Sequence, residues 1–127
     1  MMSKTNGILE QIESALSVFE YPVFYGKTFI GSNERFDYFV FNRQRIEHTG
    51  KTQNDFSYYY QVHIIMEDYI PESFEVEVIK AILNNTKLKL ANNAMTYQYT
   101  TKGGTDIVVE LLTITFVLPV RGCMLME

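Results

Sequence analysis

The two histidines, His48 and His63, are the residues best suited to acid–base chemistry or metal binding near neutral pH. They fall in two strand-like segments, and strand parity places His48 at an even and His63 at an odd position, on opposite faces of a sheet. A shared metal site is therefore not expected, and no cysteine cluster supplies further ligands. We expect His63 to be a surface or interface residue rather than a general base, because few strand histidines are catalytic.

Three other motifs contain residue types that can do chemistry. Glu67 and Asp68 form a carboxylate pair, but they end a strand and precede a helix, where a turn or capping role is expected. Residues 26–28 (GKT) end like a phosphate-binding loop, but Tyr21 stands where that loop needs its first glycine. Cys123 is the only cysteine, so no internal disulfide is possible and an inert thiol is expected. The sequence predicts no catalytic residue, no metal site and no cofactor.

The overall composition fits one folded domain. The chain has 127 residues, which predicts a single domain over 1–127 with an ordered core at about 5–120 and a C-terminal tail at 121–127. Hydrophobic residues make up 46% of it, and 9 Tyr and 9 Phe provide bulky side chains for a core. The formal charge of −4 argues against nucleic-acid wrapping, which relies on excess Lys and Arg. No apolar run is long enough for a signal peptide or a membrane span, so no membrane partner is expected.

The N-terminal segment shows helical spacing of apolar residues and predicts an amphipathic helix over about 5–20. Its apolar residues are Ile8, Leu9, Ile12, Ala15, Leu16 and Phe19. Thr5 or Asn6 is the expected cap, and Pro22 ends the helix because the residue before a proline avoids the helical region. Residues 23–25 are expected to follow as a short edge strand.

Two long strand patterns, 35–48 and 56–68, flank a polar turn at 49–55 and predict an antiparallel hairpin. The even positions of the first strand hold Phe36, Tyr38, Val40 and Ile46. Phe39 and Phe41 point to the other face, so the middle of this strand is expected to be covered on both sides. The second strand, FSYYYQVHIIMED, alternates between an apolar and a more polar face.

A second amphipathic helix is predicted over about 71–85, with Phe74, Val78 and Ile82 as its apolar row. Glutamates are concentrated at its N-terminal end, and lysines lie toward or past its C-terminal end. That order complements the helix dipole, so we interpret the charge pattern as support for the helix.

The C-terminal part predicts a second hairpin, with strands over 95–100 and 106–118 around a turn at 102–104. In its last strand the apolar residues move from odd to even positions, which predicts a β-bulge near 110–112; burial of both faces is the alternative. The predicted fold is therefore α+β. A mainly antiparallel sheet, made of a short strand, a long hairpin and a second hairpin, is packed by two amphipathic helices.

Polar residues near the tip of the long hairpin are the main candidates for an interaction surface. Arg43, Arg45, His48 and Lys51 cluster there and suit contact with phosphate or with an acidic protein surface. The alternative is that these charges keep a strand end from aggregating. The full set of candidate interface residues is Arg43, Arg45, His48, Lys51, Asn54, His63, Lys102 and Arg121.

The order of these segments resembles the tail terminator proteins of bacteriophages with long, non-contractile tails, also called tail-completion or tail-to-head joining proteins. The likeness spans about 5–120 and is carried by the leading helix, the short PVFYG strand, the long hairpin, the segment DYIPESFEVEVIKAIL and the terminal hairpin. The stretch DFSYYYQVHIIMEDYIP is its most similar part. Members of this family form a hexameric ring that caps the finished tail tube, halts its polymerisation and offers a surface to the head-side connector.

The resemblance implies a structural protein, not an enzyme, at the head-proximal end of the virion tail, made in the cytoplasm of the host bacterium. Its implied partners are further copies of itself, the tail tube protein and the head–tail connector protein. DNA passes through the lumen of such a ring without specific binding, and the acidic balance of this chain suits that passage.

Two other functions fit the same residues. A head-completion or connector protein of the same particle belongs to the same class and differs only in its neighbours. An unrelated small α+β ligand-binding module or enzyme would hold its ligand in a pocket between sheet and helices. Aromatic residues for such a pocket are Tyr58, Tyr60, Tyr97 and Tyr99.

Overall fold

Two helices and six strands make up the part of the chain that the computed structural model describes, namely residues 7–27, 34–48, 50, 55–91 and 94–121. In chain order they are α1 (Ile8–Ser17), β1 (Val23–Tyr25), β2 (Tyr38–His48), β3 (Phe56–Glu67), α2 (Phe74–Asn85), β4 (Lys89–Leu90), β5 (Thr96–Thr101) and β6 (Val108–Val120). The predicted α+β class and the order of its elements are confirmed, and β4 is an additional strand that the sequence did not predict.

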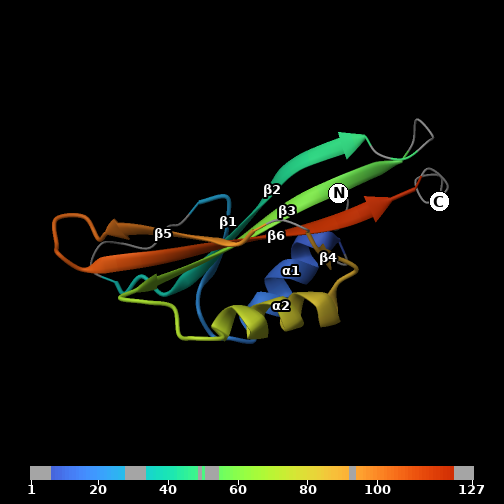
Figure 1. Cartoon of the computed structure of the whole chain (residues 1–127). Coiled ribbons are helices and arrows are strands. Elements are labelled where there is room, and N and C mark those ends of the chain that lie inside the picture. The colour runs from blue at the N-terminus through green and yellow to red at the C-terminus, as the bar shows by residue number, and fades with distance from the viewer. Residues whose placement is uncertain (1–6, 28–33, 49, 51–54, 92–93, 122–127) are drawn as a thin grey trace, which may run out of the picture.

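The strands form one sheet in the order β1-β2-β3-β6-β4, and β5 also pairs with β6. All pairs are antiparallel except β1 with β2. Strands β4 and β5 share one side of β6, because β4 pairs near Phe116 and β5 pairs along residues 108–113. Figure 1 shows both helices beneath the middle of the sheet, while the two hairpins extend past them toward opposite ends.

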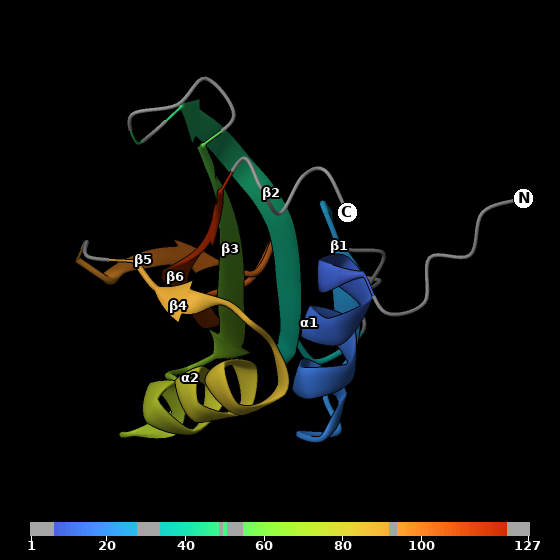
Figure 2. The ribbon, with the colours of Figure 1, turned by 90° about the vertical axis from the view of Figure 1, so that its right-hand side faces the viewer.

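The main core lies between the helices and one face of the sheet, called here the helix face. Figure 2 shows α1 and α2 side by side on that face. The helices contribute Ile12, Leu16, Phe74, Val78 and Ile82, and the central strands contribute Phe39, Phe41, Val62, Ile64, Leu112, Ile114 and Phe116. Burying each such side chain stabilises the fold by roughly 1.5–3 kcal/mol, so the predicted helix rows supply the packing that holds the sheet.

The opposite face of the sheet, called here the free face, carries a second and smaller apolar cluster. Its residues are Tyr38, Ile65 and Val109, with Phe24, Phe36, Val40 and Leu111 packed against them. The prediction that the middle of 35–48 is covered on both sides is therefore confirmed. The same cluster explains the phase change in β6, because Leu111 packs on the free face and Leu112 on the helix face.

The predicted bulge in β6 is wrong, because its ladder with β3 runs without a break through Ile65–Leu111 and Ile64–Leu112. A register shift lies instead in β2, where Arg43 pairs with Tyr60 and Arg45 with Tyr59. Gln44 is the extra residue of this β-bulge, and every side chain after it changes face. Ile46, predicted to share a face with Val40, therefore lies on the helix face opposite Tyr58.

Several element ends differ from the predictions. Helix α1 begins after the N-cap residue Gly7 rather than at 5, and the predicted caps Thr5 and Asn6 lie outside the described residues. It ends at Ser17, before the predicted 20, and Glu20 has a left-handed backbone with a φ of 65°. Helix α2 begins at Phe74 rather than 71, after Ser73 with a φ of 70°. A left-handed residue cannot continue a right-handed helix, so these positions limit both helices.

Candidate assembly surfaces

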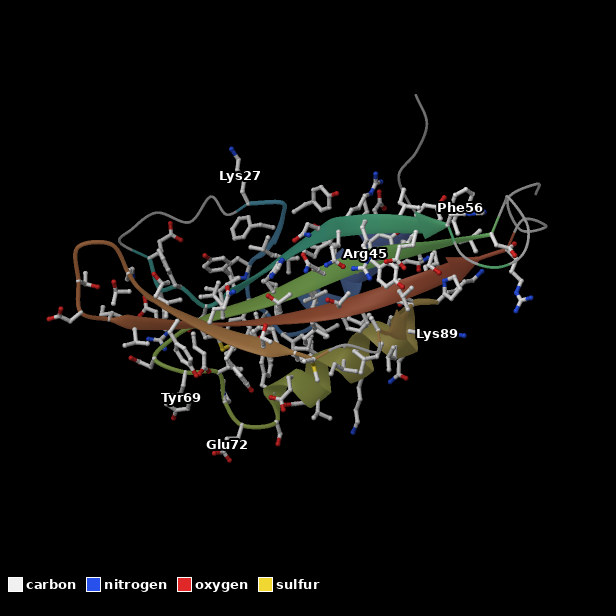
Figure 3. All side chains as sticks on the ribbon, turned by 45° about the horizontal axis from the view of Figure 1, so that its top comes forward. Lys27, Arg45, Phe56, Tyr69, Glu72 and Lys89 are labelled. Carbon is white, nitrogen blue, oxygen red and sulfur yellow. The ribbon has the colours of Figure 1, made fainter. Side chains whose placement is uncertain are left out.

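The bulge at Gln44 separates the two arginines that the sequence placed in one cluster. Arg43 pairs with Tyr60 and so lies on the helix face, whereas Arg45 pairs with Tyr59 and lies on the free face. Both positions are exposed, and Figure 3 shows Arg45 over the ladder of β2 and β3. Within the described part of the hairpin, Arg43 and Arg45 therefore lie on opposite sides of the sheet rather than in a single basic patch.

Arg45 is held by partners within its own subunit. Its guanidinium carbon lies 3.7 Å from the centre of the Tyr59 ring, and its Nε donates to Glu47 Oε2 at 2.6 Å. The hydrogen bond to Glu47 raises the pKa of Arg45, and the same bond lowers the pKa of Glu47. The cation is thus partly neutralised and stacked, which makes Arg43 the better candidate for contact with a partner.

An open groove of about 440 Å³ lies beside the bulge. It is lined by Arg43, Gln44, Arg45, Ile46, Tyr58, Tyr59 and Tyr60. Burial raises the pKa of the Tyr60 phenol, so this ring contributes apolar surface and a neutral hydroxyl. The Ile46 side chain is 61% exposed in this region, which leaves an apolar wall open to solvent.

His63 belongs to a polar network on the free face that joins three strands. Asn42 Nδ2 donates to Gln61 Oε1 at 3.1 Å and to the Arg43 carbonyl at 3.1 Å, so Asn42 Oδ1 faces His63 Nε2 at 2.7 Å. His63 Nε2 must then donate, and its Nδ1 accepts from the Thr113 hydroxyl at 2.8 Å. Burial lowers the pKa of His63, so the neutral ring links β2, β3 and β6.

Replacing His63 by Gln is expected to flatten the pH dependence of stability between about pH 7 and pH 5. The pKa of His63 in the folded protein lies below the ordinary value of 6.5, so the unfolded chain binds more protons in this window. The free energy of unfolding of the wild type therefore falls as the pH drops below about 6.5. Urea unfolding at several pH values measures the slope.

The matched control for that variant is His48→Gln, which removes the other imidazole and should keep the slope because His63 remains. Equal slopes for His63→Gln and the wild type would contradict the role given to His63.

His48 itself lies on the helix face beside the Phe56 ring, with the ring centres 5.4 Å apart. The two histidines are on opposite faces, as predicted.

Lys102 lies inside the subunit rather than on its surface. It is 8% exposed, and its Nζ donates to Glu67 Oε1 at 2.7 Å and to the Glu34 carbonyl at 2.5 Å. The backbone N–H of Phe36 donates to the same carboxylate at 3.0 Å, and Arg35 Nη1 lies 3.4 Å from Glu67 Oε2. The hydrogen bond from Lys102, followed by that from Phe36, lowers the pKa of Glu67.

This ion-pair cluster joins the base of the long hairpin to the turn of the second hairpin. Glu67 was predicted to have a turn or capping role, but its carboxylate instead pairs with Lys102 from a segment 35 residues away. We therefore assign Lys102 an intramolecular role, unlike its prediction as an interface residue. Of the remaining candidates, Arg121 is exposed just after β6, and Lys51 and Asn54 lie outside the described residues.

The outer strand β5 is a further exposed surface, and none of the interface residues predicted from the sequence lies in it. All six of its residues are exposed, and its sequence TYQYTT contains no charge and no proline. Its tyrosines lie on the helix face, where Tyr99 hydrogen-bonds the buried Glu110, and this bond raises the pKa of Tyr99. The absence of charge in TYQYTT was the available signal, because edge strands in natural proteins usually carry protective charges.

Within the described part of the chain, no group of three His, Cys, Asp or Glu residues is placed to hold a metal ion. Neither α1 nor α2 has the length and apolar character needed to cross a bilayer. No protein-family model matches the chain, and no curated protein has a significant sequence match to it.

Proposed function

We propose that the protein is the subunit of a ring that caps the tail tube of a phage with a long, non-contractile tail. The ring stops tube polymerisation and provides the surface for joining the head. It acts as a structural component at the head-proximal end of the virion tail, after synthesis in the bacterial cytoplasm. Its partners are further copies of the chain, the tail tube protein and the head–tail connector protein, with DNA passing through the lumen.

One observation carries this proposal: a single sheet runs through the whole subunit and ends in two different edges. Strand β1 forms one edge, and β4 with β5 forms the other. A cyclic ring needs heterologous contacts, in which one patch of a subunit meets a different patch of the next. Two unlike edges on opposite sides of one sheet provide such a pair of patches.

The shape of the subunit gives further support. Both hairpins extend beyond the two helices, in opposite directions (Figure 1). In a ring whose axis runs roughly along the strands, the two hairpin ends lie on opposite faces of the ring. One end is then available to the tail tube and the other to the connector, as a joining protein requires. The element order also matches the one on which the sequence resemblance rests.

Binding to isolated phage parts tests the proposal. The protein should co-sediment with purified tail tubes and halt their elongation, whereas a connector or head-completion protein should bind emptied heads instead. Arg43→Glu is expected to reduce tube binding at least tenfold with an unchanged fold, because Arg43 is an exposed cation that makes no ion pair with the described residues. Lys80→Glu, at an exposed site on α2 away from the hairpins and the sheet edges, is the matched charge control.

Arg43 is a better site for charge reversal than Arg45. Arg45→Glu removes the ion pair with Glu47 and the stacking on Tyr59, so its loss of function would mix assembly with local structure. Arg43→Glu avoids those contacts. Normal tube binding by Arg43→Glu would leave the long hairpin as scaffold alone.

The groove beside the bulge is the observation that favours the ligand-binding alternative. Among its lining residues, Arg43, Tyr58 and Tyr60 share the helix face, and a cation beside two aromatic rings suits a small anionic aromatic compound. A thermal-shift screen of metabolites tests this function. Reproducible stabilisation that is lost in a Tyr58→Ala variant, together with no binding to tail tubes, would favour the ligand-binding module.

A further inference from the structure

One backbone hydrogen bond of its hairpin shows which backbone groups of β5 face outward. The N–H of Lys102 donates to the Ile107 carbonyl at 2.9 Å, so the backbone of residue 102 points toward β6. Backbone direction alternates along a strand, so the even residues of β5 face β6 and the odd ones face away from it. Tyr97 and Tyr99 therefore present their N–H and C=O groups at the outer edge, as does Met95 just before the strand.

The directions of the backbone groups of β1 follow in the same way. The Pro22 carbonyl accepts from the N–H of Phe39 at 2.9 Å, and the N–H of Gly26 donates to the Phe41 carbonyl at 3.0 Å. The even residues of this segment thus face β2, and Val23 and Tyr25 present their backbone groups outward. No strand pairs with the outer side of β1 or β5 in the part of the chain that the structure describes.

The two edges lie at the same level of the sheet. Successive ladders place Val23 opposite Phe39, Phe39 opposite Ile64, Ile64 opposite Leu112, and Leu112 opposite Tyr97. One row of residues therefore runs from Val23 at one edge to Tyr97 at the other. A second copy that continues the sheet sideways in this register needs little shift along the strands, as a closed ring requires.

The strand directions and the side-chain faces also allow the β5 edge of one copy to pair with the β1 edge of another. Strand β1 runs parallel to β2, while β5 runs opposite to β6 and so opposite to β1. The edges of two copies would then meet antiparallel, with Tyr97 opposite Val23 and Met95 opposite Tyr25. All four residues present outward backbone groups, and Val23 and Tyr97 both lie on the helix face, since their partners Phe39 and Leu112 belong to the main core.

Three of the four side chains brought together by this pairing are exposed in the single subunit, and Val23 is partly buried against the main core. Tyr25 and Tyr97 are each 48% exposed, and Met95 is 39% exposed. An uncharged edge strand with exposed aromatic side chains is a template for pairing with another chain unless a partner covers it. Aromatic cross-strand pairs contribute roughly 0.2–1 kcal/mol each beyond the backbone hydrogen bonds, and a methionine beside a tyrosine ring adds a similar amount.

We infer that the β5 edge of one copy pairs antiparallel with the β1 edge of the next, in the register Tyr97–Val23 and Met95–Tyr25. This inference rests on the proposed ring and names its subunit contact. The sheet of each subunit then continues into its neighbour, and the exposed apolar residues at both edges become covered. The contact is heterologous, so each subunit uses β5 toward one neighbour and β1 toward the other.

Disulfide trapping tests the register. In a Cys123→Ser background, the double variant Tyr97→Cys with Val23→Cys should convert most chains to covalent oligomers under mild oxidation. Opposed residues of an antiparallel pair have Cα atoms about 4.5–5.5 Å apart, within the range that a disulfide spans. A non-reducing gel should show a ladder that ends at the ring size. Met95→Cys with Tyr25→Cys is the second pair, in case the first disturbs the fold.

The controls separate this contact from other modes of assembly. Gln98→Cys with Val23→Cys points the two thiols to opposite faces and should give no ladder. Dimers from Tyr97→Cys alone would overturn the inference in favour of a symmetric β5–β5 contact. A ring of normal size that no cysteine pair traps would also overturn it while leaving the proposed function standing, whereas a persistent monomer that ignores tail tubes would remove both.

Discussion

Lys102→Met is expected to lower the free energy of unfolding by about 2–3 kcal/mol. Methionine keeps most of the volume of the side chain but removes the ammonium group, so the buried carboxylate loses its closest partner. Removing one partner of a buried ion pair costs roughly 3–5 kcal/mol, and the nearby exposed Arg35 offsets part of that loss. Urea unfolding followed by circular dichroism measures the change.

The dependence of the free energy of unfolding on pH under acidic conditions is a second test of this prediction. The pKa of Glu67 is lowered from its ordinary value of 4.5 in the folded protein, so the stability it contributes is complete above that value and is lost as the pH falls through the folded pKa. Lys102→Met removes the largest cause of that shift and should make this loss shallower. Lys89→Met, at an exposed site, is the matched control and should change neither measurement.

The double variant Lys102→Met with Glu67→Gln should recover part of the stability, because no buried charge then lacks a partner. An Lys102→Met protein as stable as the wild type would show that the ion pair does not hold the two hairpins together. The double variant also separates this electrostatic effect from simple loss of packing, which it would not restore.

Tyr97→Pro is expected to abolish assembly while leaving the subunit folded. Proline lacks an N–H, but the N–H of residue 97 points away from β6, so the ladder within the subunit stays complete. The variant removes a donor needed by the neighbouring β1 and places a ring on the edge, as natural edge strands do to prevent pairing. We expect the free energy of unfolding to change by at most about 1 kcal/mol.

Two controls bracket this variant. Gln98→Pro removes an N–H that points toward β6 and should destabilise the subunit by roughly 2 kcal/mol, since it leaves a ladder carbonyl without its donor. Tyr97→Ala keeps the backbone donor and should weaken assembly without abolishing it. Analytical ultracentrifugation measures the assembly state of all three variants. Normal rings from Tyr97→Pro would contradict an edge contact through β5.

The regular parts of this fold could be predicted from the sequence because their periodicity is long. The alternation in FSYYYQVHIIMED identifies β3, and the row Phe74, Val78 and Ile82 identifies the buried side of α2. Adjacent apolar residues such as Phe39 and Val40 point to opposite faces of a strand, so they predict that the middle of β2 is covered on both faces. Strand β4 has only two residues, too short for any period to appear.

The bulge at Gln44 shows why local detail was harder to predict. The sequence around it, NRQRIE, contains no glycine and allows the even-odd pattern to continue, so Ile46 was given the wrong face. The bulge also provides the reason that His48 and His63 lie on opposite faces. Without the extra residue, His48 would share the face of Val40, which is the residue paired with His63.

The roles of the candidate site residues depended on contacts between distant segments. In the sequence, Lys102 is a cation beside a turn and was predicted to lie at an interface. Its partner, the Glu67 carboxylate, comes from the end of β3, far away in the chain. Arg43 and Arg45 looked like one cluster until the register separated them. The proposed contact between copies depends on the alignment of β1 with β5 across the sheet. Four successive ladders determine this alignment, so it cannot be predicted from any single segment.

Native mass spectrometry of the protein, alone at high concentration and eluted from tail tubes, tests the central claim most directly. A closed ring contains a fixed number of copies, and the resemblance to tail terminators predicts a hexamer with little population of sizes between monomer and ring. The result that would contradict the account is a monomer at every concentration that does not bind tubes, or an open-ended series of sizes with no closed species.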